Sequence, residues 1–175
     1  MALNTLPPGA FADDAITADK INLANNFAFT GTVTGAAKIG QIVQATTTSE
    51  VSNTSTSYAD TGLTGLITPT STSSKILVTV HQNGGRSQSD QNNNSIYLIL
   101  KRNSTQISQI FVYSLYTGTA LDLYGASLST SFLDSPSTTS QINYKTQFKN
   151  DVSGGHVRLQ DTSAMSTITL MEILA

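Results

Sequence analysis

From residue 39 onward the chain alternates apolar and polar side chains in short stretches, which are separated by clusters of Ser, Thr, Asn and Gly. A period of two is typical of β-strands that have one buried and one wet face. The pattern predicts eight or nine strands, near 39–47, 57–67, 75–82, 95–102, 105–113, 120–133 (interrupted), 140–148, 156–160 and 166–174. This many short strands, with no convincing helix among them, predict an all-β fold of the β-sandwich or jelly-roll type.

The predicted connections carry residues that favour tight reversals. Gly and Asn tolerate positive φ angles, and Pro fixes φ near a value that many turns need. Such residues occur at Asn83-Gly84-Gly85, Ser135-Pro136 and Gly154-Gly155. Within 140–148, every second residue from Ile142 to Phe148 lies on one face and three polar side chains lie on the other, which indicates a sheet with one wet side.

Two predicted strands carry large apolar residues on both faces, IYLIL at 96–100 and ITLMEI at 168–173. Each needs cover on both sides, either as a central strand under a second layer or as a strand whose outer face meets another subunit. A thin two-sheet sandwich has a single dry interior, which favours self-association. The candidate contacts between subunits are Leu98, Leu170 and Met171.

Residues 1–38 follow a different pattern. They contain the turn pair Pro7-Pro8, the stretch FADDAITADKINLANN at 11–26 and the alternating FAFTGTVTG at 27–35. The middle stretch has helical spacing over about two turns only, and so few apolar side chains do not stabilise a fold of their own. We therefore expect an extended N-terminal arm with a short shaft at 1–38, which orders against another molecule, and a head domain at 39–175.

The composition excludes several classes of protein. Charged residues are 11% of the chain, about 48 of the 175 residues are Ser or Thr, and the net charge is −2 with the basic residues scattered. Nucleic-acid binding needs a clustered basic face, so neither nucleic acid nor an anionic membrane is an expected partner. The sequence has no cysteine, no run of 18 apolar residues and no signal-like start. We expect a protein made in a cytoplasm that does not insert into a membrane.

The motifs of common catalytic and cofactor sites, such as GxSxG, the Walker loop, GxGxxG and HExxH, do not occur in the sequence. His81 and His156 are far apart, and turn or capping roles account for most of the acids. Glu172 is the exception because it sits in the apolar C-terminal strand, where an ion pair with Lys75 or Arg158 is the expected explanation. We expect no catalytic residue, no metal and no cofactor, and we do not expect an enzyme.

Tyrosines are the main candidates for ligand contact. Tyr113, Tyr116 and Tyr124 occur among leucines. Exposed aromatic rings commonly bind the faces of sugars, and the alternative is packing in the sandwich or between subunits. Arg86 is a further candidate because it lies in the polar segment 84–95, which is either a binding loop or a solvated connection.

The segment FADDAITADKINLANNFAFTGTVTG at 11–35 resembles the arm and shaft entry of bacteriophage tail-fibre proteins. The stretches IGQIVQATTTSE, SSKILVTVHQNGG, YLILKRNST, LDSPSTTSQINYKTQF and STITLMEI resemble β-sandwich tips of marine and freshwater phage structural proteins. The resemblance implies a homotrimeric virion protein without enzymatic activity, with an attachment arm and a globular head. The chain is far shorter than long tail fibres and has no repetitive shaft, which favours a short fibre, a fibre on the capsid or neck, or a capsid decoration protein.

The leading hypothesis is therefore a short trimeric fibre of the virion. Its arm docks into other virion proteins of the tail, neck or capsid, and its head meets a glycan on the host surface with three weak sites that act together. A capsid decoration or cement protein and a free carbohydrate-binding module are the alternatives.

Overall fold

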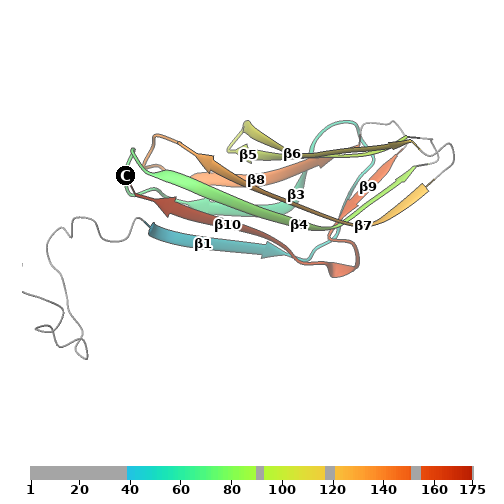
Figure 1. Ribbon diagram of the computed structural model, residues 1–175, viewed down its shortest axis with the longest axis horizontal. Helices are drawn as coiled ribbons and strands as arrows, with labels where there is room; N and C mark the ends of the chain where they lie inside the picture. Colours follow the sequence, from blue (N-terminus) through green and yellow to red (C-terminus); the bar gives the residue numbers. More distant parts are fainter. Residues whose placement is uncertain (1–38, 90–92, 117–120, 151–154, 175) are drawn as a thin grey trace, which may run out of the picture. The chain divides into compact units, whose positions relative to one another are not determined.

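The computed structural model describes residues 39–89, 93–116, 121–150 and 155–174, and at 88–89, 93–95, 111–116 and 121–126 it describes the backbone alone. These residues form ten strands in two antiparallel sheets (Figure 1). The predicted all-β sandwich is confirmed, since the short 3-10 turn η2 (Asp161–Ser163) is the one helical element in the described ranges. The predicted arm, residues 1–38, lies outside them.

Sheet A has six strands and sheet B has four. The long strand β4 (Lys75–Ser89) is the centre of sheet A, with β7 (Leu121–Asp134) along one side. On its other side, the first half of β4 pairs with β10 (Ser166–Ile173), which is followed outward by β1 (Ile39–Thr47). The second half pairs on the same side with β9 (His156–Leu159), which is followed outward by β2 (Val51–Asn53). Sheet B has the order β3 (Ala59–Ile67), β8 (Ile142–Lys149), β5 (Asn93–Arg102) and β6 (Thr105–Tyr116).

The reversal predicted at 83–85 is wrong, because β4 runs through these residues to Ser89. The pairing with β7 shifts register between Gln82 and Gly85, and Gly84 adopts a positive φ of 62°. A Cβ at Gly84 would lie 2.5 Å from the backbone nitrogen of Asp161. The glycines thus make a bulge that lets η2 pack closely against the strand, and most of the predicted polar loop at 84–95 is strand. Strand β7, predicted as interrupted, is continuous.

The inward faces of the two sheets form two apolar clusters. One of them contains ten fully or nearly fully buried residues, Leu63, Ile67, Ile76, Val78, Val80, Leu100, Ile142, Tyr144, Ile168 and Leu170. The other contains Ile96, Leu98, Leu128, Phe148, Val157 and Leu159. The alternation predicted for 140–148 is confirmed, since β8 buries every second residue from Ile142 onward.

Four fully buried polar side chains connect the sheets between these clusters, Thr61, Gln82, Thr146 and Ser166. Thr146 lies between Tyr144 and Phe148 along β8, and its hydroxyl is 2.5 Å from the hydroxyl of Thr61. The Thr146 hydroxyl donates to Gln82 Oε1 (3.0 Å), and Gln82 Nε2 donates to Ser166 Oγ (3.0 Å). Because each group has a partner, this polar bridge avoids the penalty of burying unpaired groups and fixes how the sheets face each other.

Candidate functional surfaces

The outer face of sheet A carries a row of apolar side chains in register across four strands. Ile42 of β1 pairs with Met171 of β10, Met171 pairs with Leu77 of β4, and Leu77 pairs with Leu133 of β7. Strands lie about 4.8 Å apart, so the row is about 14 Å wide. Ile42 is 58% exposed and Leu133 is 50% exposed, while the side chains between them are half-buried.

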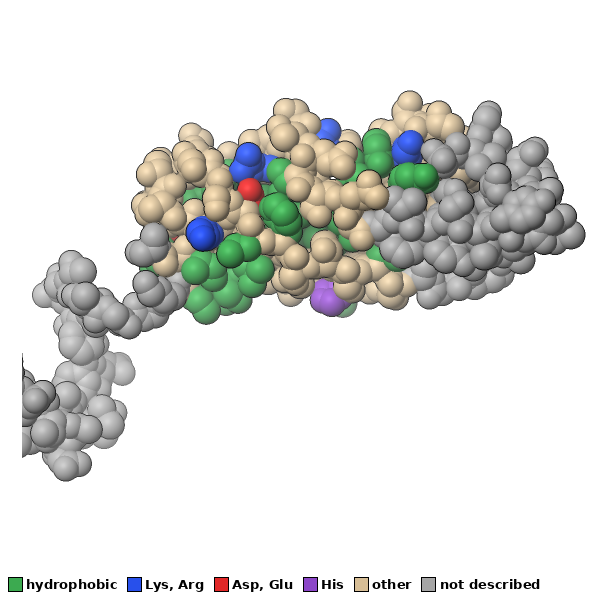
Figure 2. Space-filling view, turned by 45° about the horizontal axis from the view of Figure 1, so that its top comes forward, with side chains coloured by type: hydrophobic (Ala, Val, Ile, Leu, Met, Phe, Trp, Pro, Cys, Tyr) green, Lys and Arg blue, Asp and Glu red, His purple; other side chains and the backbone are tan. Residues whose placement is uncertain are grey.

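A bulge in β1 adds a second apolar pair beside this row. Ile39 pairs with Ile173, which is on the same face of β10 as Met171, so the bulge between residues 39 and 42 turns both isoleucines of β1 outward. Ile39 is 47% exposed. We call the six residues Ile39, Ile42, Leu77, Leu133, Met171 and Ile173 the apolar patch. Figure 2 shows hydrophobic side chains gathered at the end of the head where β1 begins.

Where its side chains are described, the rest of this outer face is polar. The next row after the apolar patch contains Gln44, which donates to the Thr169 hydroxyl at 3.1 Å. Further along, the His81 ring lies 2.8 Å from the hydroxyl of Ser129. Among the side chains that the structure describes, the apolar ones on this face are therefore concentrated at one end of the sheet. A concentrated exposed apolar area is typical of an interaction surface.

The outer face of sheet B has a different chemistry. Lys101 of β5 lies directly opposite Lys145 of β8, and Tyr97 lies opposite Lys149. The Lys149 ammonium is 4.8 Å from the centre of the Tyr97 ring and 5.4 Å from that of Tyr58. Lysine ammonium groups at such distances interact favourably with aromatic faces. Three lysines and two tyrosines thus share one side of this sheet.

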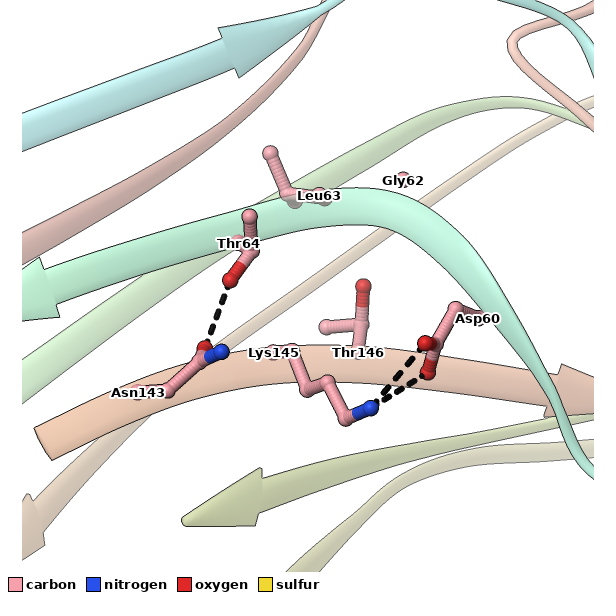
Figure 3. Close-up of a pocket in the computed structure, with 7 residues that line it drawn as sticks. All are labelled: Asp60, Gly62, Leu63, Thr64, Asn143, Lys145 and Thr146. Atoms are coloured by element: carbon pink, nitrogen blue, oxygen red, sulfur yellow. Dashed lines mark hydrogen bonds and ion pairs between the residues drawn. The ribbon is translucent and has the colours of Figure 1, made fainter. Parts of the chain in front are cut away.

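A hollow of about 170 Å³ opens on this face where β3 bulges away from β8 (Figure 3). Between Asp60 and Thr64 the register of β3 shifts against β8, and Gly62 adopts a positive φ of 79°. A side chain larger than hydrogen is strained at such a φ, so glycine makes this bulge possible. The hollow is lined by Asp60, Gly62, Leu63, Thr64, Asn143, Lys145 and Thr146.

Asp60 and Lys145 form an ion pair at the rim of the hollow, with 2.9 Å between Lys145 Nζ and Asp60 Oδ1 (Figure 3). Gln147 Nε2 donates to the same oxygen, Asp60 Oδ1, at 2.7 Å. Burial raises the pKa of Asp60, but the hydrogen bonds from Lys145 and Gln147 and the charges of Lys145 and Lys101 outweigh it and hold the pKa below its usual value. The hollow therefore presents a carboxylate next to an ammonium.

Glu172 has a structural role, but the predicted ion pair with Lys75 or Arg158 is wrong. Its buried carboxylate accepts hydrogen bonds at 2.7 Å from Gln41 Nε2, from the Thr70 backbone nitrogen and from the Thr70 hydroxyl. Burial raises the pKa of Glu172, yet these hydrogen bonds lower it to about 2. Arg158 is instead 3.6 Å from Glu50. Glu172 thus ties the β3–β4 connection to β10.

A second buried carboxylate, Asp134, is also held within the chain. Arg102 Nη1 donates to both of its oxygens at 2.9 and 3.0 Å, and the Tyr144 hydroxyl donates at 2.6 Å. Burial, followed by the hydrogen bond and charge of Asp134, raises the pKa of Tyr144. Since these groups satisfy each other inside the sandwich, they belong to its packing and not to a surface site.

The candidate subunit contacts fall in two different environments. Leu98 and Leu170 are fully buried in the two core clusters, so the interior of a single chain accounts for their apolar character. Their prediction as surface contacts is wrong, because a strand with apolar residues on both faces does not reveal in its sequence which face points inward. Met171 lies on the outer face, in the apolar patch.

The candidate ligand contacts are not brought together in the described residues. Arg86 of β4 is half-buried, and its Nη1 lies 3.8 Å from Asp161 Oδ2. The side chains of Tyr113, Tyr116 and Tyr124 lie outside the described part of the chain, and the backbone of the first two pairs with Ile96 and Asn93. The sequence prediction missed Tyr58 and Tyr97, which lie beside Lys149 on the outer face of sheet B. The signal for Tyr97 in the sequence was its place between two inward residues, Ile96 and Leu98.

Within the described ranges, no three His, Cys, Asp or Glu side chains are grouped in a way that could hold a metal ion. No helix in the same ranges is long and apolar enough to cross a membrane. No protein-family model matches the chain, and a search of curated proteins finds no significant match. The two outer faces of the sandwich are therefore the basis for assigning a function.

Proposed function

We propose that the chain is a structural subunit of a phage particle, a short trimeric fibre that joins the virion through residues 1–38 and presents the β-sandwich as its head to the host surface. The observation that carries this proposal is the apolar patch. Ile42 and Leu133 are at least half exposed at its two ends, and burial of exposed apolar area is the main favourable contribution to association.

A second copy of the chain fits this patch because of where the patch lies. Ile39, the first residue of β1, is part of it, so the point at which residue 38 joins the head lies at its border. An axis of symmetry close to the patch brings these points from all copies to one place. A bundle of arms is what a fibre needs for attachment, whereas a patch at the opposite end would keep the arms apart.

The direct test is the native mass of the full-length protein by light scattering. One chain has a mass of 18.5 kDa, so we expect about 55 kDa for the wild type. We expect Leu133→Asp to give single chains, because a charge that is buried without a partner in a contact is strongly unfavourable. The melting temperature by circular dichroism should stay near that of a folded head.

Leu66→Asp is the matched control, since Leu66 is 48% exposed on the outer face of sheet B and receives the same substitution. It should leave the trimer intact. A wild type that is monomeric at micromolar concentration, or a Leu133→Asp variant that keeps the wild-type mass, overturns the proposal. If the wild-type trimer binds empty capsids but no host cells, the protein is a capsid decoration protein and not a fibre.

A further inference from the structure

We propose that the outer face of sheet B binds an acidic glycan, with the carboxylate of a uronate-type sugar beside Lys101 and Lys145 and its neighbouring ring in the hollow at the β3 bulge. The inference rests on the proposed function only in that a fibre head meets a surface glycan. It adds the place of contact and the chemical class of the sugar.

The lysine arrangement is the first argument. Lys101 and Lys145 are direct cross-strand partners, and like charges in such positions destabilise a sheet. Asp60 compensates Lys145 through the ion pair, but Lys101 forms neither an ion pair nor a hydrogen bond with any residue that the structure describes. A bound carboxylate next to Lys101 would neutralise the second positive charge. The two ammonium groups would then lie between two carboxylates, that of Asp60 and that of the ligand.

The charge of the whole face is the second argument. Lys101, Lys145 and Lys149 outnumber Asp60 on it, although the chain as a whole has a net charge of −2. On the outer face of sheet A, Arg86 and Arg158 lie opposite each other, but each has a carboxylate partner, Asp161 at 3.8 Å and Glu50 at 3.6 Å. Lys75 is the one lysine on that face among the described residues. An anion is therefore attracted to sheet B in preference to sheet A. Three lysines are too few for the phosphate contacts that nucleic-acid binding usually requires.

The hollow provides the third argument, because its lining suits a sugar. Hydroxyl, amide, carboxylate and ammonium groups come together there, from Thr64, Asn143, Asp60 and Lys145. Thr64 donates to Asn143 Oδ1 at 2.6 Å, which holds the amide at the rim. A volume of about 170 Å³ is below the ~300 Å³ at which drug-sized sites begin. The hollow is therefore suited to a single sugar ring with several hydroxyl groups.

The experiment is calorimetric titration of the full-length protein with a hyaluronan-derived tetrasaccharide, in which uronates alternate with N-acetylated sugars. Chitotetraose, which is neutral, is the matched probe. We expect binding of the acidic tetrasaccharide that is at least tenfold tighter than that of the neutral one. Lys101→Met should weaken it at least tenfold, because the substitution removes the ammonium and keeps the length of the side chain.

Lys75→Met on sheet A is the control and should bind like the wild type. Equal affinity for the two tetrasaccharides, no binding of either, or an unaffected Lys101→Met variant overturns the inference. Equally strong binding of inorganic phosphate would also overturn it, since the site would then recognise charge alone. The native mass of the same samples reports on assembly separately, so a trimer that fails to bind refutes this inference and leaves the proposed fibre in place.

Discussion

The two outer faces of the sandwich are built by the same alternation of residues, yet they differ in every property that matters for binding. Sheet A presents isoleucine, leucine and methionine in register at one end, and, among the described side chains, hydroxyl, amide, imidazole and guanidinium groups beyond. Sheet B presents lysines, tyrosines and a carboxylate around a hollow. A sandwich needs only its interior to fold, so the outward residues of both sheets are free to serve contacts with other molecules.

The comparison teaches that the alternation of residues predicts that each strand has an inner and an outer face, but it does not reveal which outer face binds another molecule. An apolar outward residue such as Leu77 stands between two inward ones, Ile76 and Val78, and is indistinguishable from them in the sequence. Only the register of three strands, β10, β4 and β7, shows that it has Met171 and Leu133 as neighbours. The functional signal is thus a property of the sheet, not of any single strand.

The largest expected effect is the difference in stability between a charge placed on the inner face of β10 and the same charge placed on its outer face. Leu170→Asp places an unpaired charge among core residues and should destabilise the head by more than about 4 kcal/mol, which unfolds it. Met171→Asp, one residue further along, should leave the chain folded and dissociate the trimer. Circular dichroism and light scattering of both variants test this. If both variants unfold, or both remain folded trimers, the division into inner and outer faces is incorrect.

A smaller effect comes from Glu172, the carboxylate buried in sheet A. The pKa of Glu172 falls from 4.5 in the unfolded chain to about 2 in the folded head. Ionised Glu172 therefore contributes on the order of 3 kcal/mol to the free energy of unfolding. This stability is fully present above about pH 4.5 and is lost as the pH falls towards 2. Glu172→Gln should be less stable at pH 7, and its disadvantage should shrink in that window.

The measurement is urea unfolding of both proteins at several pH values. Asp60→Asn on the outer face of sheet B is the comparison, because Asp60 is largely exposed and its ion pair contributes little. A Glu172→Gln variant that follows the wild-type pH dependence throughout would show that Glu172 does not carry the effect.

The smallest effect concerns the bulge that forms the hollow on sheet B. Gly62→Ala should destabilise the head by about 1 kcal/mol, because alanine is strained at a φ of 79°. Open space surrounds the position, with Thr47 Oγ1 at 3.8 Å as the nearest atom that a Cβ would meet. The change should therefore weaken glycan binding by altering the bulge and leave the native mass unchanged. A loss of the trimer would mean that the two faces are not independent.

Much of the fold was predictable because, outside the bulges, the inward positions repeat with a period of two. The start of β1 and the end of β10 were found nearly to the residue, and β8 has the predicted wet face. The glycines at 84 and 85 predict a turn but form a bulge, because a bulge and a turn use the same residues. Strand β2 was missed since three residues are too short for a pattern.

The candidate surfaces were less predictable, for a physical reason. The charge on sheet B arises from Lys101 and Lys145, which are 44 positions apart in sequence and meet only through the β5–β8 register. The partners of Glu172 likewise come from the loop at Thr70 and from Gln41, more than a hundred residues away. Polar groups without charge can satisfy a buried carboxylate as well as a cation does, and sequence offers no signal for them.

The polar bridge through the core also limits how this fold can go wrong. Ile, Val and Leu side chains would still find apolar neighbours if one sheet slid along the other by a pair of residues. Thr61, Gln82, Thr146 and Ser166 would not, because each would then be buried opposite a hydrocarbon surface. The polar bridge thus selects one alignment of the two sheets, because its hydrogen bonds form in that alignment alone. Replacing one of its four members would leave a partner unpaired, so they can be exchanged only together.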